Sequence, residues 1–243
     1  EEAVEIAMEG GGTFSVRLVD CVGYLVPGAV GQLEDGEPRM VHTPWFPQEI
    51  PMAEAAEIGT RKVIAEHATI GIVITTDGTI TDLPREAYPE AEGRVIEELK
   101  ALGKPFLILL NSAHPQGEAA QKLRAKLAEQ YDVTCLAVSC LDLDQQAVTE
   151  IIQAVLYEFP LEELQLFLPD WVETLPTEHP IRTALFQAIR AQAGKLVRIR
   201  DVKPAVAAMG QCELVTGASV TGMKLGSGCC QARLELPRSL FYD

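Results

Sequence analysis

An aspartate followed three residues later by a glycine is the pattern in this sequence with the most specific chemistry. Asp20 ends the run 16–20 (VRLVD), Gly23 follows it, and residues 24–51 are rich in proline and glycine. A carboxylate at a strand end can hold Mg²⁺ through water, and a glycine N–H beside it can approach a γ-phosphate because no side chain intervenes. This DxxG arrangement is typical of nucleotide-switch proteins. The alternative is an ordinary strand-to-loop turn, in which aspartate and glycine are both common.

A second set of polar residues follows three apolar runs that we expect to be buried strands. Ligands of α/β proteins bind beyond the carboxyl ends of parallel strands, so these residues are candidates for contacts with a nucleotide. They are Thr75, Asp77, Asn111, Ser112, His114, Ser139 and Cys140. The stretch 75–78 (TTDG) also fits a standard turn, and both interpretations stay open.

Alternating strands and helices must position these residues. Residues 70–75 (IGIVIT), 106–110 (FLILL) and 134–138 (TCLAV) are continuous apolar runs. Amphipathic stretches predict helices over residues 91–102 and 118–129, and a third that begins near Asp144. Continuous apolar strands are typical of a parallel sheet that is covered on both faces.

Before these units, the sequence predicts a hairpin of strands over 4–8 and 14–19, one long loop over 24–51, and a helix over 52–68. The first part of the chain is therefore predicted to be α/β, with about five strands.

The order of these elements matches GTPase-like P-loop proteins after their first strand. In that order the strand 106–110 leads into the base-recognition motif NKxD, which here is 111–114 (NSAH). Ser112 replaces the lysine that packs over the base, and His114 replaces the aspartate that binds guanine. A histidine cannot offer a bidentate carboxylate edge, so we expect guanine specificity to be lost. Ser139 and Cys140 stand where such proteins usually have Ser-Ala close to the base.

A second, smaller part is predicted from residue 159 onward. A helix over 177–193 and strand-like runs ending in 230–236 (CQARLEL) indicate a small α+β domain, whose last strand alternates and has one wet face. We therefore expect two domains, over residues 1–158 and 159–243. The second domain is predicted to make protein contacts.

Composition restricts the function further. The 243 residues carry a formal net charge of −15, which disfavours nucleic acid and anionic lipid as direct partners. No apolar run is long enough to cross a bilayer, and the sequence shows no charged-then-apolar leader, so we do not expect secretion. Six cysteines without a CxxC pair indicate structural thiols in a reducing cytosol. The four histidines lack metal-ligand spacing, and Trp45 and Phe46 either contact a partner or fold over the core.

Longer segments resemble one family over nearly the whole chain. They are VRLVDCVGYLVPGAVG, PRMVHTPWF, EIPMAEAAEIGTRKVI, TTDGTITDLPRE, KPFLILLNSAHP, VLYEFP, WVETLPTEHP, KLVRIRDVKPAV and LPRSLFYD. These segments are similar to the stage IV sporulation protein A family of endospore-forming bacteria. Long ungapped runs of this kind are far more specific than DxxG alone.

The resemblance implies a cytosolic spore coat morphogenetic protein of the mother cell. Such a protein is expected to be a GTPase-derived ATPase that uses ATP and Mg²⁺ and self-assembles into a basement layer around the forespore. A small amphipathic membrane protein would tether this layer to the outer forespore membrane, and other coat proteins would be further partners. By resemblance, the magnesium-site aspartate carries over to Asp20 and the altered base motif to Asn111 through His114.

The sequence departs from the family pattern at its start. The family begins with a GxxxxGK[ST] P-loop followed by polar switch threonines, and neither is found here. The glycine-rich run 222–228 (GMKLGSG) has the wrong order and is predicted to be a hairpin turn. We therefore expect the first strand and the P-loop to be missing, and this chain not to hydrolyse ATP although the full-length protein does. A structural scaffold with a relict site is the alternative, and a GTP-using switch is a third hypothesis.

Overall fold

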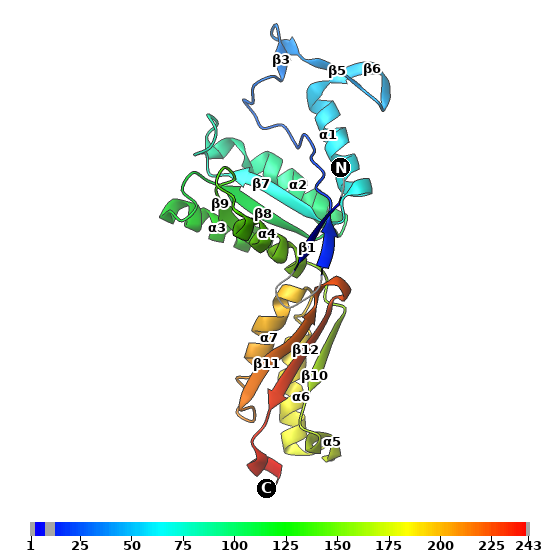
Figure 1. Cartoon of the computed structure of the whole chain (residues 1–243), viewed down its shortest axis with the longest axis vertical. Helices are drawn as coiled ribbons and strands as arrows, with labels where there is room; N and C mark the ends of the chain where they lie inside the picture. The colour runs from blue at the N-terminus through cyan, green and yellow to red at the C-terminus, as the bar shows by residue number, and fades with distance from the viewer. Residues whose placement is uncertain (1–2, 8–12, 242–243) are drawn as a thin grey trace. The chain divides into compact units, whose positions relative to one another are not determined.

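The structure is a computed structural model that describes residues 3–7 and 13–241. Its internal contacts separate two units, Glu1–Val155 and Leu156–Asp243. Each unit contains its own three-stranded sheet (Figure 1). Strands and helices alternate around the sheet of the first unit, whereas the sheet of the second unit is mixed.

The sheet of the first unit is parallel and has the strand order β7-β8-β9. Its strands are β7 (Gly71–Thr76), β8 (Phe106–Asn111) and β9 (Cys135–Val138), and its helices are α2 (Pro89–Ala101), α3 (Glu118–Tyr131) and α4 (Gln145–Tyr157). In register, Val73 lies beside Ile108, which lies beside Cys135. The predicted α/β fold with a parallel sheet is therefore confirmed for these three strands.

β8 is the central strand of this sheet, and helices cover both of its faces. All five residues of the run 106–110 are buried. Ile108 and Leu110 pack in one cluster with residues of α2 and α3, while Leu107 and Leu109 pack in another with residues of α4. Burying one such side chain contributes roughly 1.5–3 kcal/mol. Coverage on both faces is the physical reason why this strand is apolar without alternation.

The N-terminal hairpin forms a separate two-stranded sheet. β1 (Val4–Ala7) pairs antiparallel with β2 (Thr13–Val16), as the sequence predicts. Met8, the last residue of the predicted first strand, lies outside the described residues. The five strands predicted for the first part of the chain are therefore all present, two in this hairpin and three in the parallel sheet.

The second strand of the hairpin is shorter than predicted. β2 ends at Val16, and residues 17–26 have no regular structure, so the prediction of a strand that runs to Asp20 is wrong. Leu18 and Val19 have exposed fractions of 69% and 50%. Apolar, branched residues favour a strand only where a neighbouring strand and a packing surface exist, and the structure provides neither for this segment.

Residues 24–51 are more ordered than the one long loop that the sequence predicts. They contain two short hairpins, β3 (Leu33–Glu34) with β4 (Glu37–Pro38) and β5 (Met40–Thr43) with β6 (Phe46–Pro51). The second hairpin leads directly into α1 (Met52–Lys62), which continues as a π-helical turn (Val63–His67). The predicted helix over 52–68 is thus present, with a change of helix type after Lys62.

The sheet of the second unit has the strand order β10-β12-β11, and α6 and α7 lie on the same face of it (Figure 1). Its elements are β10 (Glu163–Phe167), α5 (Trp171–Thr174), α6 (Pro180–Ala193), α7 (Val202–Met209), β11 (Gly217–Lys224) and β12 (Cys229–Glu235). β12 pairs parallel with β10 and antiparallel with β11. Ala232 and Leu234 are buried whereas Arg233 and Glu235 are exposed, which confirms the predicted alternation.

The glycine-rich run 222–228 is a hairpin connection, as predicted. It holds the end of β11 and a 3₁₀ turn (Leu225–Ser227) that leads into β12. Gly228 has a φ of +64°, and a Cβ added there would lie 2.8 Å from the carbonyl oxygen of Pro160. The backbone conformation and the close approach of Pro160 each require glycine at this position. A phosphate-binding role is not needed to explain it. The remaining 3₁₀ turns are Arg85–Ala87, Ile199–Asp201 and Arg238–Phe241.

Candidate functional site

The C-terminal ends of the three parallel strands meet at one edge of the first sheet. Thr76 pairs in register with Asn111, and Asn111 pairs with Val138. The polar residues predicted from the sequence lie at or directly after these positions, so the fold brings them to the same edge. They are Thr75, Asp77, Asn111, Ser112, His114, Ser139 and Cys140. We call the segments that follow β7, β8 and β9 the strand-end loops.

The loops after β7 and β8 are joined through the carboxylate of Asp77. Ser112 Oγ donates a hydrogen bond to Asp77 Oδ2 at 2.6 Å. Thr79 donates to Oδ1 of Asp77 from its hydroxyl at 2.5 Å and from its N–H at 3.1 Å. Thr79 Oγ1 in turn accepts from the N–H of Ala113 at 2.9 Å, and Ser112 Oγ accepts from the N–H of His114 at 3.0 Å. These bonds, which we call the Asp77 clamp, fix the backbone of the loop after β8.

Asp77 is held in its charged form by this clamp. Burial raises the pKa of its carboxyl, but the hydrogen bonds from Ser112 and Thr79 outweigh burial, and the resulting pKa is below its ordinary value. Because both carboxylate oxygens already accept hydrogen bonds from the protein, the geometry favours a role in positioning the loops. A direct contact between Asp77 and a nucleotide stays a prediction.

The loops after β8 and β9 are joined by Asn111. Its side-chain oxygen accepts a hydrogen bond from the N–H of Cys140 at 3.0 Å. Within the loop after β9, Ser139 Oγ donates to Asp142 Oδ2 at 2.7 Å. Burial raises the pKa of the Cys140 thiol, so this sulfur stays protonated at neutral pH and is a poor nucleophile. The three strand-end loops are therefore linked to one another in sequence order.

The two substituted positions of the base motif lie in opposite environments. Ser112 is fully buried, and its hydroxyl is used between the Asp77 carboxylate and the N–H of His114. His114 is exposed. The loop 111–114 thus presents an imidazole outward and has no carboxylate that could accept two hydrogen bonds from guanine.

Thr75 is engaged by an ion pair in the interior of the first unit. Arg85 Nη1 donates to Thr75 Oγ1 at 3.0 Å and to Glu92 Oε2 at 2.8 Å, while Arg85 Nη2 donates to Glu92 Oε1 at 3.1 Å. Tyr131 also donates to Glu92 Oε1 at 3.3 Å. The hydroxyl of Thr75 therefore contributes to holding the end of β7 against α2, and its predicted contact with a nucleotide stays a prediction.

Sequence reasoning missed three residues of this edge, Thr79, Arg85 and Glu92. Thr79 stands two positions after Asp77, which is the spacing of an Asx turn, so this signal was present in the sequence. Arg85 begins a 3₁₀ turn and Glu92 lies in the first turn of α2, and their positions in two different elements gave no sequence signal that they pair.

Asp20 and Gly23 lie in the segment 17–26, which no strand pairing connects to the parallel sheet. Asp20 is exposed, and Gly23 has a φ of +78°, which glycine adopts at little cost and other residues do not. The structure does not bring Asp20 to the strand-end loops through a shared strand, so the predicted position of Asp20 at a strand end is wrong. Its role as a magnesium ligand stays a prediction.

Asp20 offers a carboxylate oxygen, a ligand type that suits Mg²⁺ better than a transition metal. Among the residues that the structure describes, no group of three His, Cys, Asp or Glu side chains is placed to hold a metal ion. Mg²⁺ keeps several of its waters and binds through one or two carboxylates together with phosphate oxygens. The exposed Asp20 carboxylate meets this requirement without a protein cage.

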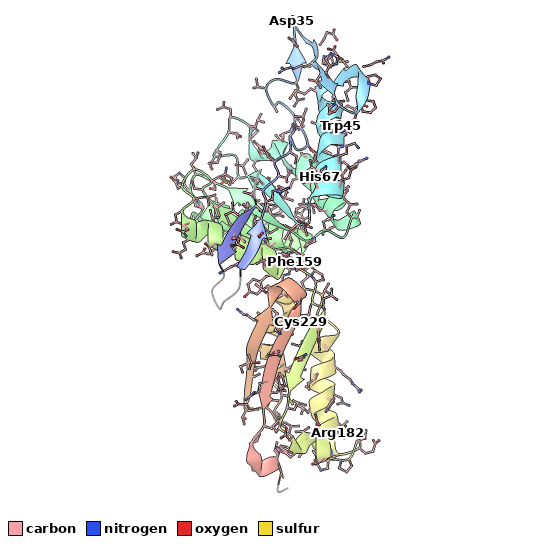
Figure 2. The ribbon with its side chains drawn as sticks, turned by 45° about the vertical axis from the view of Figure 1, so that its right-hand side comes forward. Asp35, Trp45, His67, Phe159, Arg182 and Cys229 are labelled. Carbon is pink, nitrogen blue, oxygen red and sulfur yellow. The ribbon has the colours of Figure 1, made fainter. Side chains whose placement is uncertain are left out.

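An apolar groove of about 480 Å³ runs along α1 and contains none of the predicted nucleotide residues. Trp45, between β5 and β6, and His67, at the end of the π-helical turn, both line it, and Figure 2 labels them at separate positions. The Trp45 ring packs on Gly59 of α1, where an added Cβ would lie 3.1 Å from it. Trp45 and Phe46 nevertheless keep exposed fractions of 42% and 41%, so they are neither fully buried nor fully free of the core.

The chain matches two models of one protein family that together span its length. Residues 1–160 match the ATPase domain of stage IV sporulation protein A, and residues 161–243 match the middle domain of the same protein. No solved structure matches the chain.

Curated relatives give the same result. The chain is 43% identical over 240 residues to stage IV sporulation protein A of Bacillus subtilis (strain 168) and equally identical to that of Bacillus anthracis. It is 39% identical over 242 residues to stage IV sporulation protein A of Clostridioides difficile (strain 630). The alignments cover 99% to 100% of this chain and 49% of each relative, so the chain spans about half the length of the curated relatives it matches.

Proposed function

Because the chain belongs to the stage IV sporulation protein A family, we propose that it acts in building the spore coat as an ATP-hydrolysing protein. Hydrolysis of ATP with Mg²⁺ would drive self-assembly into the basement layer around the forespore. The match of residues 1–160 to an ATPase domain supports the hydrolytic activity, and the names of the relatives support the role in sporulation.

The observation that carries the choice of nucleotide is the altered loop after β8. The Ser112 hydroxyl is buried in the Asp77 clamp, and the exposed His114 stands where a guanine-binding aspartate would stand. A carboxylate accepts hydrogen bonds from the N–H groups of guanine, whereas an imidazole N–H donates to the acceptor nitrogens of adenine. ATP is therefore the nucleotide that this loop suits.

We propose a P-loop fold of the GTPase type for the first unit. The parallel order β7-β8-β9 and the polar residues at the carboxyl ends of its strands support this assignment. In this fold Asp20 would hold Mg²⁺ through water, and the N–H of Gly23 would face the γ-phosphate. Mg²⁺, when bound, neutralises charge on the phosphate oxygens during transfer. Asn111 and Cys140 would hold the loops that surround the base.

Two domains, over residues 1–158 and 159–243, complete the proposal. The separation of the units at Leu156 and the boundary of the family matches at residue 160 both support a division close to this point. The sequence of this chain contains no GxxxxGK[ST] motif, whose amides and lysine bind the β- and γ-phosphates. We therefore expect the 243-residue chain alone to be inactive and the full-length protein to hydrolyse ATP.

Partners and a location are also proposed on the basis of the family. We propose that the protein binds further copies of itself, a small amphipathic membrane-anchoring spore protein and other coat proteins, in the mother-cell cytoplasm at the outer surface of the forespore. A peripheral association through that partner requires no membrane-spanning helix, and none of the helices in the described part of the chain is long and apolar enough to span a membrane.

A scaffold without catalysis is the second candidate function. The exposed position of Asp20 outside the parallel sheet, and the use of Thr75 and Asp77 in contacts within the protein, favour it. In that case the nucleotide fold would serve polymerisation alone.

Turnover and filament formation by the full-length protein distinguish the two functions. Asp20→Asn is compared with Asp35→Asn, a second exposed aspartate, which Figure 2 labels in the segment before β5. If the protein is an assembly ATPase, Asp20→Asn lowers ATP turnover by about tenfold or more and blocks filaments, while Asp35→Asn does neither. Filaments that form equally well without ATP would establish the scaffold, and GTP turnover equal to ATP turnover would overturn the assignment of adenine.

A further inference from the structure

One buried side chain anchors the segment that carries Asp20 and Gly23. Among residues 17–26, all of which the structure describes, Tyr24 alone is buried, with an exposed fraction of 9%. Its neighbour Val22 is 68% exposed, and Asp20 and Cys21 are exposed as well. Cys21 and Val22 also line the groove along α1 but stay exposed, so the ring of Tyr24 is the buried contact of this segment with the rest of the first unit.

Tyr24 is seated against a frame of charged residues on α1 and α2. Arg94 of α2 binds Glu57 of α1 with Nη1 and Oε1 2.8 Å apart, and Arg61 of α1 binds Glu98 of α2 at 2.9 Å. The guanidinium carbon of Arg94 lies 4.6 Å from the centre of the Tyr24 ring, a cation–π contact. Two interhelical ion pairs thus fix the helices between which this ring is held.

The hydroxyl of Tyr24 contributes little to this anchoring. Burial, followed by the neighbouring Glu98 carboxylate, raises the pKa of Tyr24 to about 12, so the phenol is neutral. Among the described residues the hydroxyl nevertheless has no hydrogen-bond partner, although Glu98 is nearby. The ring, through burial and its contact with Arg94, is therefore the part that holds the segment.

Gly23 sets the backbone direction directly before Tyr24. Its φ of +78° lies in the left-handed region, and an added Cβ would have no neighbour within 4 Å. The position therefore requires glycine for its backbone conformation, not for lack of space. Gly23 thus separates the exposed residues 20–22 from the buried Tyr24.

We propose that Tyr24 is a positioning residue, whose ring between α1 and α2 fixes the location of Asp20 and Gly23 relative to bound Mg²⁺ and phosphate. This inference rests on the proposed ATPase function and adds the device that holds its phosphate end. Tyr24 itself contacts neither nucleotide nor metal in this account. Its substitution acts on the geometry of Asp20, so the Mg²⁺ requirement changes before the affinity for the base does.

The first test needs no nucleotide activity. Tyr24→Ala, Tyr24→Phe and Tyr157→Ala are made in the 243-residue chain; Tyr157 also has a cation over its ring, Lys203 at 5.5 Å, but lies in α4. Trypsin cleavage after the exposed Arg17 is followed, with cleavage after the exposed Arg39 as the internal control. Tyr24→Ala is expected to speed cleavage after Arg17 by about tenfold and to leave cleavage after Arg39 unchanged. Tyr24→Phe and Tyr157→Ala are expected to match the wild type.

The second test measures ATP turnover of the full-length variants against Mg²⁺ and ATP concentration. Tyr24→Ala is expected to raise the Mg²⁺ concentration for half-maximal turnover by about tenfold, with KM for ATP within about twofold, and Tyr24→Phe to restore wild-type behaviour. Unchanged cleavage after Arg17 would overturn the anchor. Faster cleavage with an unchanged Mg²⁺ requirement would overturn the positioning role. Faster cleavage in a protein that never hydrolyses ATP would keep the anchor and reject the proposed function.

Discussion

Removing one partner of the ion pair between Arg85 and Glu92 is expected to destabilise the first unit strongly. The two side chains make a bidentate contact at 2.8 and 3.1 Å, with exposed fractions of 18% for Arg85 and 3% for Glu92. Arg85 also donates to Thr75 and to the carbonyl oxygen of Thr76 at 3.3 Å. One guanidinium therefore joins the end of β7 to the first turn of α2.

Removing Arg85 leaves the Glu92 carboxylate in a buried position without its counter-ion. Breaking a buried pair in this way costs about 3–5 kcal/mol. Glu92 lies in the first turn of α2, where the helix N-terminus stabilises a negative charge by roughly 0.3–1 kcal/mol, and Tyr131 still donates to it. We therefore expect Arg85→Met to lower the free energy of unfolding by about 3 kcal/mol, the lower end of this range. This loss is a change of roughly a hundredfold in the unfolding equilibrium.

Urea unfolding measures this loss in the first unit alone. The sequence has two tryptophans, Trp45 in the first unit and Trp171 in the second, so Trp45 fluorescence in a Trp171→Phe background follows the first unit. Arg85→Met, Glu92→Met and the double variant form a double-mutant cycle. The double variant is expected to be destabilised by much less than the sum of the single variants, because no charge is left unpaired.

The pair Arg94 and Glu57 is the matched control, since it has the same N–O distance of 2.8 Å but exposed fractions of 44% and 40%. Glu57→Gln breaks this exposed pair but leaves the contact of Arg94 with Tyr24 in place, and it is expected to cost less than about 1 kcal/mol. An Arg85→Met variant as stable as Glu57→Gln, or single effects that simply add in the double variant, would refute this reasoning.

Three further predictions concern packing, thiol reactivity and pH. Gly71→Ala places a Cβ 2.9 Å from Leu99, so urea unfolding is expected to show a loss of about 1–3 kcal/mol, and an unchanged midpoint would contradict the packing described above. Burial raises the pKa of Cys135 to about 11, so a thiol reagent at pH 8 is expected to label the exposed Cys21 and to spare Cys135 until the protein unfolds; equal labelling of both would disprove it. The lowered pKa of Asp77 predicts that wild type is more stable than Asp77→Asn above the unfolded-state pKa of about 3.9, and that this advantage disappears as the pH falls through the lower folded-state pKa. Urea midpoints of the two proteins from pH 7 to the acid limit measure this, and a constant difference would rule it out.

The core of the first unit could be predicted because its signal is local. Residues 106–110 are apolar at every position, which indicates a strand covered on both faces, and the helices before and after it repeat their apolar residues on one face. The convergence of Asn111, Asp77 and Cys140 at one edge followed from the parallel direction of the strands alone.

The strand that was expected to end at Asp20 could not be predicted correctly, because a strand needs a partner. The run 16–20 has the apolar composition of a strand, yet Leu18 and Val19 are exposed once pairing with β1 ends at Val16. Composition measures how well a residue suits a sheet and does not show whether a neighbouring strand is there to pair with.

The side-chain contacts within the site also could not be predicted from the sequence. The roles of Thr75 and Asp77 depend on where the loops place Arg85, Ser112 and Thr79, and loop geometry is set by tertiary contacts. A polar residue at a strand end is therefore a candidate for ligand binding or for fixing the loops, and only the positions of its neighbours decide between the two.

The two ends of the proposed nucleotide site are held in different ways, and this difference has a functional consequence. At the base end, the Asp77 clamp and Asn111 tie three loops together with side-chain hydrogen bonds, so this end is expected to be rigid and to discriminate between bases. At the phosphate end, the segment with Asp20 is held chiefly by the ring of Tyr24. Displacing one ring from between α1 and α2 requires no rearrangement of the parallel sheet. In the proposed assembly ATPase, a change of nucleotide state would therefore be able to move Asp20 while the base stays bound, which would separate binding from switching.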